Sequence, residues 1–403
     1  MTLWASTRRV FIPLAAALAL ALFGCGGSTS RGDGGSGGGT ATGGGGGGGA
    51  MGGGGGTADG GTGGGSGNPD GGCSEANLPA CNYPVGAGTF TQRQSTITDP
   101  VTGRVLPLLA RVPAGSGPFP VVVYSHGGGL LDQGHLQSTE WAESLAQHGF
   151  LTVNVGHVGL DTDAGVTLCG LAQVPMSECV APTDDDTDGL LALVKARDLT
   201  AVLDALPALK QTLEMAGGPQ VDLAHVAVMG WSAGSRAPLI MHGATFHPSA
   251  SAPLYSSPHN LPVAAVALSP TGPGYGGFFA ETGNSSWDQV RGPVFTATGD
   301  NDVKPTKPGL TGPVRRVSWE RQPADGTRWL LYSKLPPGVG GHSTYNLEDL
   351  TSTDPRLQRI SYALRSAVLA FLDAQLKGDP AAAAYLASGD VLTLAGDADW
   401  QHQ

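Results

Sequence analysis

The sequence predicts an α/β fold, in which a mostly parallel sheet of eight strands has helices on both faces. Two observations support this fold class. From about residue 86 to residue 376, short apolar runs rich in β-branched residues alternate with amphipathic helical segments. Some of these runs, such as FPVVVYS at 119–125, are apolar almost throughout, which is typical of a strand buried on both faces.

The expected elements follow in order along this region. Strands are expected at 89–98, 104–112, 119–125, 150–157, 224–230, 262–269, 292–299 and 328–334. Helices are expected at 139–150, 188–206, 232–244 and 356–376. The segments 158–187 and 270–290 fit no regular element. Both follow carboxyl ends of strands, the edge where ligands bind in open α/β sheets, so we expect them to form pocket loops.

The first 25 residues are typical of an export signal. Arg8 and Arg9 precede an apolar run, 10–23, that is too short for a stable membrane span. The signal ends in LFGC at 22–25, which resembles the lipobox of bacterial lipoproteins. This resemblance implies cleavage before Cys25 and lipidation of its thiol, and a plain secretory signal is the alternative. We therefore expect an exported protein of the bacterial cell envelope, anchored to the membrane through Cys25.

The segment that follows has a composition that cannot form a core. Residues 26–72 contain 28 glycines, with Ser and Thr between them, so few side chains can be buried against the entropy of ordering glycine. We expect a disordered tether there. A cysteine-containing lead-in at 73–85, the folded domain at 86–376 and a C-terminal appendage at 377–403, rich in Ala and Asp, complete the expected organisation.

Four cysteines remain after the lipobox, and an even number in an exported chain indicates disulfides. Three pairings of four cysteines are possible. The short spacings favour Cys73 with Cys81 and Cys169 with Cys179, each closing a small loop. No C-x-x-C pair or Cys/His cluster points to zinc.

The charge balance narrows the classes of partner. The chain has 33 acidic and 22 basic residues and a net charge of −11, which disfavours a nucleic-acid partner. An acidic run, 184–188, resembles the first half of a calcium loop, but Lys195 stands where the bidentate Glu belongs. A solvated run that caps the next helix is the simpler interpretation. We expect no metal and no cofactor.

The motif GWSAG at 230–234 lies where a short strand runs directly into a helix. In that context a G-x-S-x-G motif forms a sharp turn that exposes its serine at the top of the sheet. The flanking glycines let strand and helix approach closely. Ser232 is therefore the candidate nucleophile.

A second glycine motif, SHGGG at 125–129, follows an earlier strand. Stabilising an oxyanion requires two backbone N–H groups, one from the residue after the nucleophile and one from such a loop. Ala233 supplies the first. For the second we favour Gly128, with Gly127 as the alternative. We expect His126 to shape the loop by hydrogen bonding rather than to act as the base.

A serine nucleophile needs a base and an orienting acid, in the chain order Ser, acid, His for this architecture. The turn GDND at 299–302 offers Asp302 and, as the less favoured alternative, Asp300. His342, in GGHS, is the only histidine between that turn and the closing helix. It is the candidate base.

Together SHGGG, GWSAGS, GDND and GGHS resemble the α/β-hydrolase superfamily over roughly residues 86–376. Within it, FPVVVYSHGGG (119–129), the histidine of VNVGH (153–157) and the helix KARDLTAVLDAL (195–206) most resemble the dienelactone hydrolase-like group, which also includes platelet-activating-factor acetylhydrolase relatives. The resemblance implies a Ser-His-Asp mechanism with an acyl-enzyme intermediate and a small-molecule carboxylic ester as substrate. A peptidase or amidase on the same fold and a non-catalytic surface binding lipoprotein are the alternatives. The sequence leaves the acyl and alcohol groups and the oligomeric state open.

Overall fold

The computed structural model describes residues 73–182, 189–215, 217–304 and 306–403. The chain divides into two units, Met1–Gly64 and Gly65–Gln403, and only the second contains described residues. The expected signal, lipidation site Cys25 and tether, together with the acidic run at 184–188, lie outside the described residues. Among the described residues, no helix combines the length and the apolar character that a membrane crossing requires.

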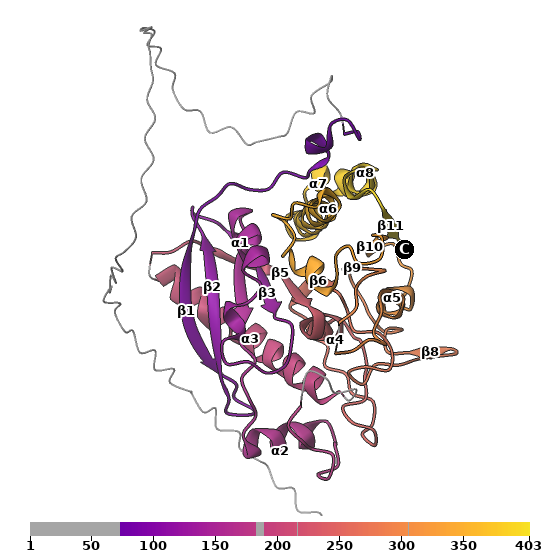
Figure 1. Ribbon diagram of the computed structural model, residues 1–403. Coiled ribbons are helices and arrows are strands. Elements are labelled where there is room, and N and C mark those ends of the chain that lie inside the picture. Colours follow the sequence, from indigo (N-terminus) through magenta and orange to yellow (C-terminus); the bar gives the residue numbers. More distant parts are fainter. Residues whose placement is uncertain (1–72, 183–188, 216, 305) are drawn as a thin grey trace, which may run out of the picture. The chain divides into compact units, whose positions relative to one another are not determined.

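A nine-stranded sheet forms the centre of the described unit, in the order β1-β2-β4-β3-β5-β6-β9-β10-β11 (Figure 1). Parallel pairing joins the six strands from β4 to β10, whereas β1, β2 and β11 pair antiparallel toward the two edges. The predicted α/β class with a mostly parallel sheet is confirmed, and the order is consistent with an α/β-hydrolase-like topology. The nine strands are β1 (Phe90–Thr98), β2 (Val105–Pro113), β3 (Phe119–Ser125), β4 (Leu151–Val155), β5 (Val221–Trp231), β6 (Pro262–Leu268), β9 (Val294–Gly299), β10 (Arg328–Ser333) and β11 (Ala398–His402).

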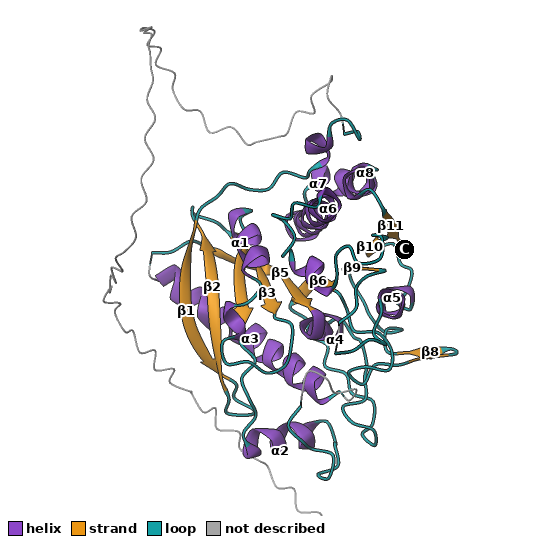
Figure 2. Cartoon of the chain, viewed as in Figure 1, coloured by secondary structure: helices purple, strands orange, loops and turns teal. Residues whose placement is uncertain are grey.

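Helices cover both faces of this sheet (Figure 2). Side chains of α3 and α4 join the apolar cluster on one face, and those of α1 and α6 join the cluster on the other. The α-helices are α1 (Thr139–Gln147), α2 (Thr162–Leu171), α3 (Leu190–Met215), α4 (Arg236–Met241), α5 (Gly312–Glu320), α6 (Pro355–Leu372), α7 (Pro380–Ala387) and α8 (Asp390–Ala395). Shorter elements are η1 (Leu78–Cys81), η2 (Gly134–Leu136), η3 (Ser232–Ser235), η4 (His342–Asn346), η5 (Asp373–Lys377) and the strand pair β7 (Ala280–Glu281) and β8 (Asn284–Ser285).

The central strands are apolar at consecutive positions because both faces of the sheet are buried. Val121 and Val123 belong to the cluster with α3 and α4, whereas Val122 and Tyr124 belong to the cluster with α1 and α6. Successive side chains of a strand point to opposite faces, so each face receives every second residue. The continuous apolar run at 119–125 therefore indicates a strand covered on both sides.

The sheet has nine strands instead of the predicted eight, because β11 lies within 377–403. Its sequence, ADWQH, is too polar to indicate a buried strand, which suits its place at the edge beside β10. Trp400 stacks on Trp329 of β10, with ring centroids 5.0 Å apart. This aromatic pair attaches the C-terminal strand to the sheet.

The sequence-based expectation omitted α2, α5, α7 and α8 and ended α3 too early. Residues 158–187 contain α2 where no regular element was predicted, because Gly165 and Gly170 lower the helix propensity. Asp161 caps α2 by accepting a hydrogen bond from the backbone N–H of Ala164 at 2.8 Å. Helix α3 continues to residue 215 through Pro207, where the prediction ended it at residue 206.

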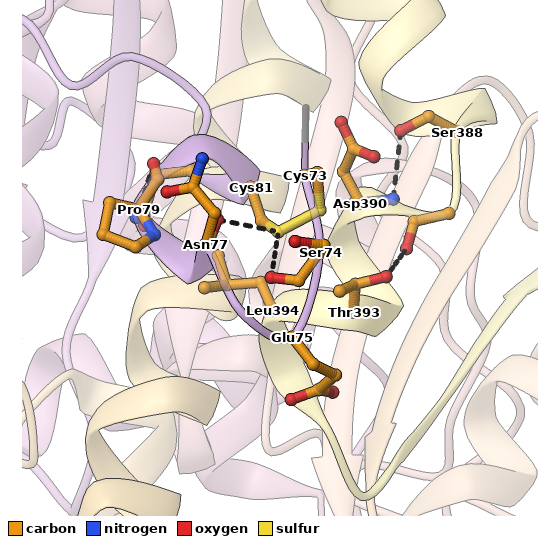
Figure 3. Close-up of a disulfide and its surroundings, with 12 residues drawn as sticks. Cys73, Ser74, Glu75, Asn77, Pro79, Cys81, Ser388, Asp390, Thr393 and Leu394 are labelled. Carbon is orange, nitrogen blue, oxygen red and sulfur yellow. Dashed lines mark hydrogen bonds between the residues drawn. A yellow bond between two sulfur atoms is a disulfide. The ribbon is translucent and has the colours of Figure 1, made fainter. Parts of the chain in front are cut away.

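Two disulfides join the predicted cysteine pairs. Cys73 bonds to Cys81, and Cys169 on α2 bonds to Cys179. Figure 3 shows the first disulfide beside side chains of α8. The hydroxyl of Tyr385 donates a hydrogen bond to the carbonyl of Cys81 at 2.8 Å. Disulfides of this kind are typical of an oxidising, extracytoplasmic compartment.

Candidate active site

The nucleophile motif forms the turn between β5 and η3. Ser232 has φ of +57°, in the left-handed region that non-glycine residues rarely occupy. Gly234 is required by close approach, since a Cβ at this position would lie 2.2 Å from the carbonyl oxygen of Ser125. A Cβ at Gly230 would lie 2.3 Å from the carbonyl oxygen of Gly234. The turn therefore holds Ser232 in a strained conformation between two glycines that no larger residue can replace.

The three predicted catalytic side chains meet in one hydrogen-bonded chain. Ser232 Oγ lies 2.6 Å from His342 Nε2, and His342 Nδ1 lies 2.7 Å from Asp302 Oδ1. Because a carboxylate only accepts, Nδ1 carries the proton and Nε2 accepts from the serine hydroxyl. Ser232 follows β5, Asp302 follows β9 and His342 begins η4 after β10, so the carboxyl ends of three parallel strands bring them together.

Asp302 is fully buried and bonded on every side. Ser269 Oγ donates to its carboxylate, at 2.6 Å from Oδ2 and 2.7 Å from Oδ1, and Thr298 Oγ1 donates to Oδ2 at 2.8 Å. Arg315 Nε lies 3.2 Å from Oδ1. Burial acts to raise the pKa of Asp302, but Arg315, His342 and Ser269 outweigh it and leave this pKa below its ordinary value. The carboxylate is therefore held in its charged form.

Asp300, the less favoured acid, lies apart from this chain. Its Oδ1 accepts a hydrogen bond from the hydroxyl of Tyr332 at 2.7 Å. Its backbone N–H donates to the carbonyl of Ser333 at 2.9 Å. Of the two aspartates in GDND, the structure brings only Asp302 to His342.

The predicted oxyanion residues lie on both sides of Ser232. Ala233 follows it in η3 and is buried. The backbone of Gly127 approaches from the other side, since a Cβ built on it would lie 3.3 Å from the Cβ of Ser232. Gly128, the favoured donor in the sequence-based prediction, is the next residue and has φ of +74°. The choice between Gly127 and Gly128 stays a prediction.

Two site residues were not identified from the sequence. Ser269, at the end of β6, contacts both Asp302 and His342, with 2.8 Å between its Oγ and Nδ1 of the histidine. Arg315 of α5 also donates to the carbonyls of Ser269 and Pro270, at 3.0 and 2.9 Å. Neither residue belongs to a local motif. The only available signal for Ser269 was its place at the carboxyl end of a predicted parallel strand.

Trp231 of the GWSAG motif precedes the nucleophile and supports the base. Its indole N–H donates to the carbonyl of His342 at 3.2 Å, and the two ring centroids lie 5.1 Å apart. Together these contacts fix both the backbone and the ring of His342. The bulky residue of the GWSAG motif thus orders the histidine loop.

The acidic run considered for calcium lies outside the described residues. The later position in the chain that would carry the bidentate Glu of a calcium loop is described. Lys195, which stands where the bidentate Glu belongs, is fully buried and donates to the carbonyl of His126 at 3.0 Å. Within the described ranges, no group of three or more His, Cys, Asp or Glu residues is placed to hold a metal ion.

Comparison of the chain with protein-family models gives no match, and a search of curated proteins gives none either.

Proposed function

We propose that this protein is a serine hydrolase of the α/β-hydrolase type that cleaves carboxylic esters through an acyl-enzyme intermediate. The observation that carries the proposal is the chain from Ser232 through His342 to Asp302, with a hydrogen bond of 2.6 Å at the serine. A base within this distance can take the serine proton as the nucleophile attacks.

In the acylation half, Ser232 Oγ bonds to the ester carbonyl carbon while its proton moves to His342 Nε2. The carbonyl oxygen becomes an oxyanion, which accepts hydrogen bonds from the N–H of Ala233 and of Gly128 or Gly127. The bond from carbon to the alcohol oxygen then breaks, and that oxygen takes the proton from Nε2. Asp302 keeps Nδ1 protonated and balances the charge of the imidazolium.

In the deacylation half, His342 Nε2 takes a proton from a water molecule as its oxygen attacks the acyl carbon. The second oxyanion collapses, the bond from carbon to Ser232 Oγ breaks, and Oγ takes the proton from Nε2. A carboxylic acid leaves and the free serine is restored. No step requires a cofactor.

We further propose that the enzyme works outside the cytoplasm, attached to a membrane through a lipid on Cys25. The two disulfides support an oxidising compartment. Metabolic labelling with a radioactive fatty acid tests the anchor: the wild-type chain should incorporate the label and Cys25→Ala should not. Label that persists in the variant would contradict anchoring at Cys25.

The ester proposal is tested with a panel of p-nitrophenyl esters beside peptide anilides of matched acyl groups. Turnover of esters that is lost in Ser232→Ala is the expected result. Faster turnover of the anilides would favour a peptidase or amidase, and no turnover of either class would favour a binding protein. A thermal unfolding temperature of Ser232→Ala equal to that of the wild type would show that the loss of turnover comes from the missing nucleophile rather than from misfolding.

A further inference from the structure

Ser, His and Asp side chains form a second hydrogen-bonded chain next to the glycine loop at 125–129. Ser125, the last residue of β3, has its Oγ 2.8 Å from His157 Nε2, and His157 Nδ1 lies 2.9 Å from Asp198 Oδ2. Arg104 pairs with the other oxygen of Asp198 at 2.5 Å. Ser125, His157 and Asp198 are all fully buried, so they cannot meet a substrate. Their role must be sought in what they hold in place.

Hydrogen-bonding rules fix the direction of each bond. Burial, aided by nearby cations, holds the pKa of His157 well below its ordinary value, and burial also lowers the pKa of His126 well below its ordinary value. Both rings are therefore neutral. His157 donates from Nδ1 to Asp198 and accepts from Ser125 at Nε2. His126 donates from Nδ1 to the carbonyl of Gly127 at 2.6 Å.

The same network forms hydrogen bonds with both ends of the loop. The backbone N–H of His157 lies 3.5 Å from His126 Nε2, and the His157 carbonyl accepts from the N–H of Leu131 at 2.7 Å. The rings of His126 and His157 pack with centroids 4.9 Å apart. Residues 126–131 are thus attached to His157 before and after the glycines.

Two successive carbonyls of the loop are anchored to buried donors. Lys195 Nζ donates to the carbonyl of His126 at 3.0 Å, and the His126 ring donates to the carbonyl of Gly127. In a trans peptide the C=O and the following N–H point in opposite directions. Anchoring these two carbonyls therefore turns the N–H groups of Gly127 and Gly128 away from the network. Burial lowers the pKa of Lys195, but an amine keeps N–H donors in either protonation state.

We propose that Lys195 and the His126 ring are positioning residues that set the oxyanion hole, with the Ser125–His157–Asp198 chain as their rigid support. This inference rests on the proposed esterase function. It assigns the second Ser-His-Asp chain to the alignment of backbone donors rather than to bond cleavage. It also explains why a lysine, which is rarely buried completely, lies beneath a catalytic loop.

The test compares Lys195→Met with Lys210→Met in the full chain. Lys210 is a matched control, because it lies on the same helix and also donates to a backbone carbonyl, that of Val221. Each variant is assayed on a carbonyl ester and on the corresponding thionoester. Sulfur accepts hydrogen bonds weakly, so the ratio of the two kcat values reports the oxyanion hole.

We expect Lys195→Met to lower kcat on the carbonyl ester about 10²-fold with little change in KM, and to lower kcat on the thionoester much less. Lys210→Met should leave the ratio unchanged. Should Lys195→Met not fold, His126→Phe removes the second anchor while keeping a ring, and the same fall in the ratio is expected.

If Lys195→Met and His126→Phe each lower kcat by the same factor on the ester and on the thionoester, or leave both kcat values unchanged, the positioning role is overturned. The esterase proposal would then still stand. Absence of hydrolysis by the wild-type protein would instead overturn both. Because the wild-type rate is measured first, the two failures are distinguishable.

Discussion

The hydrogen-bonded chain from Ser232 to Asp302 and the one from Ser125 to Asp198 contain the same three residue types, and their serines lie at the carboxyl ends of the adjacent strands β5 and β3. Their hydrogen bonds are nearly equal, at 2.6 and 2.7 Å in the first and 2.8 and 2.9 Å in the second. Backbone and exposure separate them. Ser232 has φ of +57° and is 8% exposed, whereas Ser125 ends a regular strand and is fully buried.

This difference teaches that residue types and distances do not by themselves define a nucleophile. The turn around Ser232 presents its hydroxyl at the carboxyl edge of the sheet, and the side chain of His342 keeps 12% exposure there. Ser125, His157 and Asp198 are buried in the core, where they can stabilise the structure but cannot contact a substrate.

The largest expected contrast is between the two serines. Ser232→Ala should lower kcat for ester hydrolysis about 10⁵-fold or more, because it removes the attacking oxygen. Ser125→Ala should keep kcat within about 10-fold and should cost about 1–3 kcal/mol of unfolding free energy, since His157 loses its donor. Steady-state kinetics and urea denaturation measure both. A kcat for Ser125→Ala as low as that of Ser232→Ala would remove the distinction between the chains.

A smaller contrast is expected between the two aspartates. Asp302→Asn should lower kcat about 10⁴-fold, because an amide no longer holds the required tautomer of His342. Asp198→Asn should reduce the unfolding free energy by about 3–5 kcal/mol, because Arg104 is left as a buried charge with a weakened partner. Its kcat at a temperature where the protein stays folded should fall far less. Reversed effects in the two variants would refute the assignment.

The next prediction concerns Arg315 and the pH dependence of activity and unfolding. Arg315 lowers the pKa of Asp302. The ionised Asp302 carboxylate therefore contributes stability above the carboxyl pKa of the unfolded chain, and this contribution is lost as pH falls through the Asp302 pKa of the folded protein. In Arg315→Met the Asp302 pKa should rise. The acid limb of kcat/KM and the acid unfolding midpoint should then both move to higher pH.

The neighbour of Arg315 provides the control for this shift. Arg316 pairs instead with Glu320 and Asp399, so Arg316→Met should leave the acid limb in place. A pH profile of Arg315→Met that overlays the wild-type profile would show that the cation does not set the charge of Asp302.

The smallest expected effect concerns Ser269. Loss of its hydroxyl in Ser269→Ala removes one hydrogen bond to Asp302, worth about 1 kcal/mol, and should lower kcat about 5–10-fold. Ser269 also has φ of +49°, which glycine adopts without strain. Ser269→Gly should therefore lose the same activity but unfold at a higher temperature than Ser269→Ala. Full activity in either variant would contradict a role for the hydroxyl.

The sequence predicted the parts of the site that carry local motifs. GWSAG, GDND and GGHS each combine a tight turn with one functional side chain, so Ser232, Asp302 and His342 could be named before their contacts were seen. Asp302 could be preferred to Asp300 only by motif context, and the structure places it 2.7 Å from the histidine. The parallel sheet was predictable because its central strands are apolar on both faces.

The parts that could not be predicted depend on contacts between distant segments. Lys195 follows the acidic run in the sequence and is buried against the carbonyl of His126, 69 residues away. Ser269 and Arg315 reach Asp302 from two other elements. Strand β11 is polar and gains its place from Trp400 and its pairing with β10. No local pattern encodes such contacts.

The most direct test of the central claim is mass spectrometry of the protein after reaction with a fluorophosphonate. We predict a single phosphonyl adduct on the peptide that contains Ser232, none on the peptide that contains Ser125, and no adduct in Ser232→Ala. A folded wild-type protein that stays unlabelled, or an adduct on Ser125, would contradict the account.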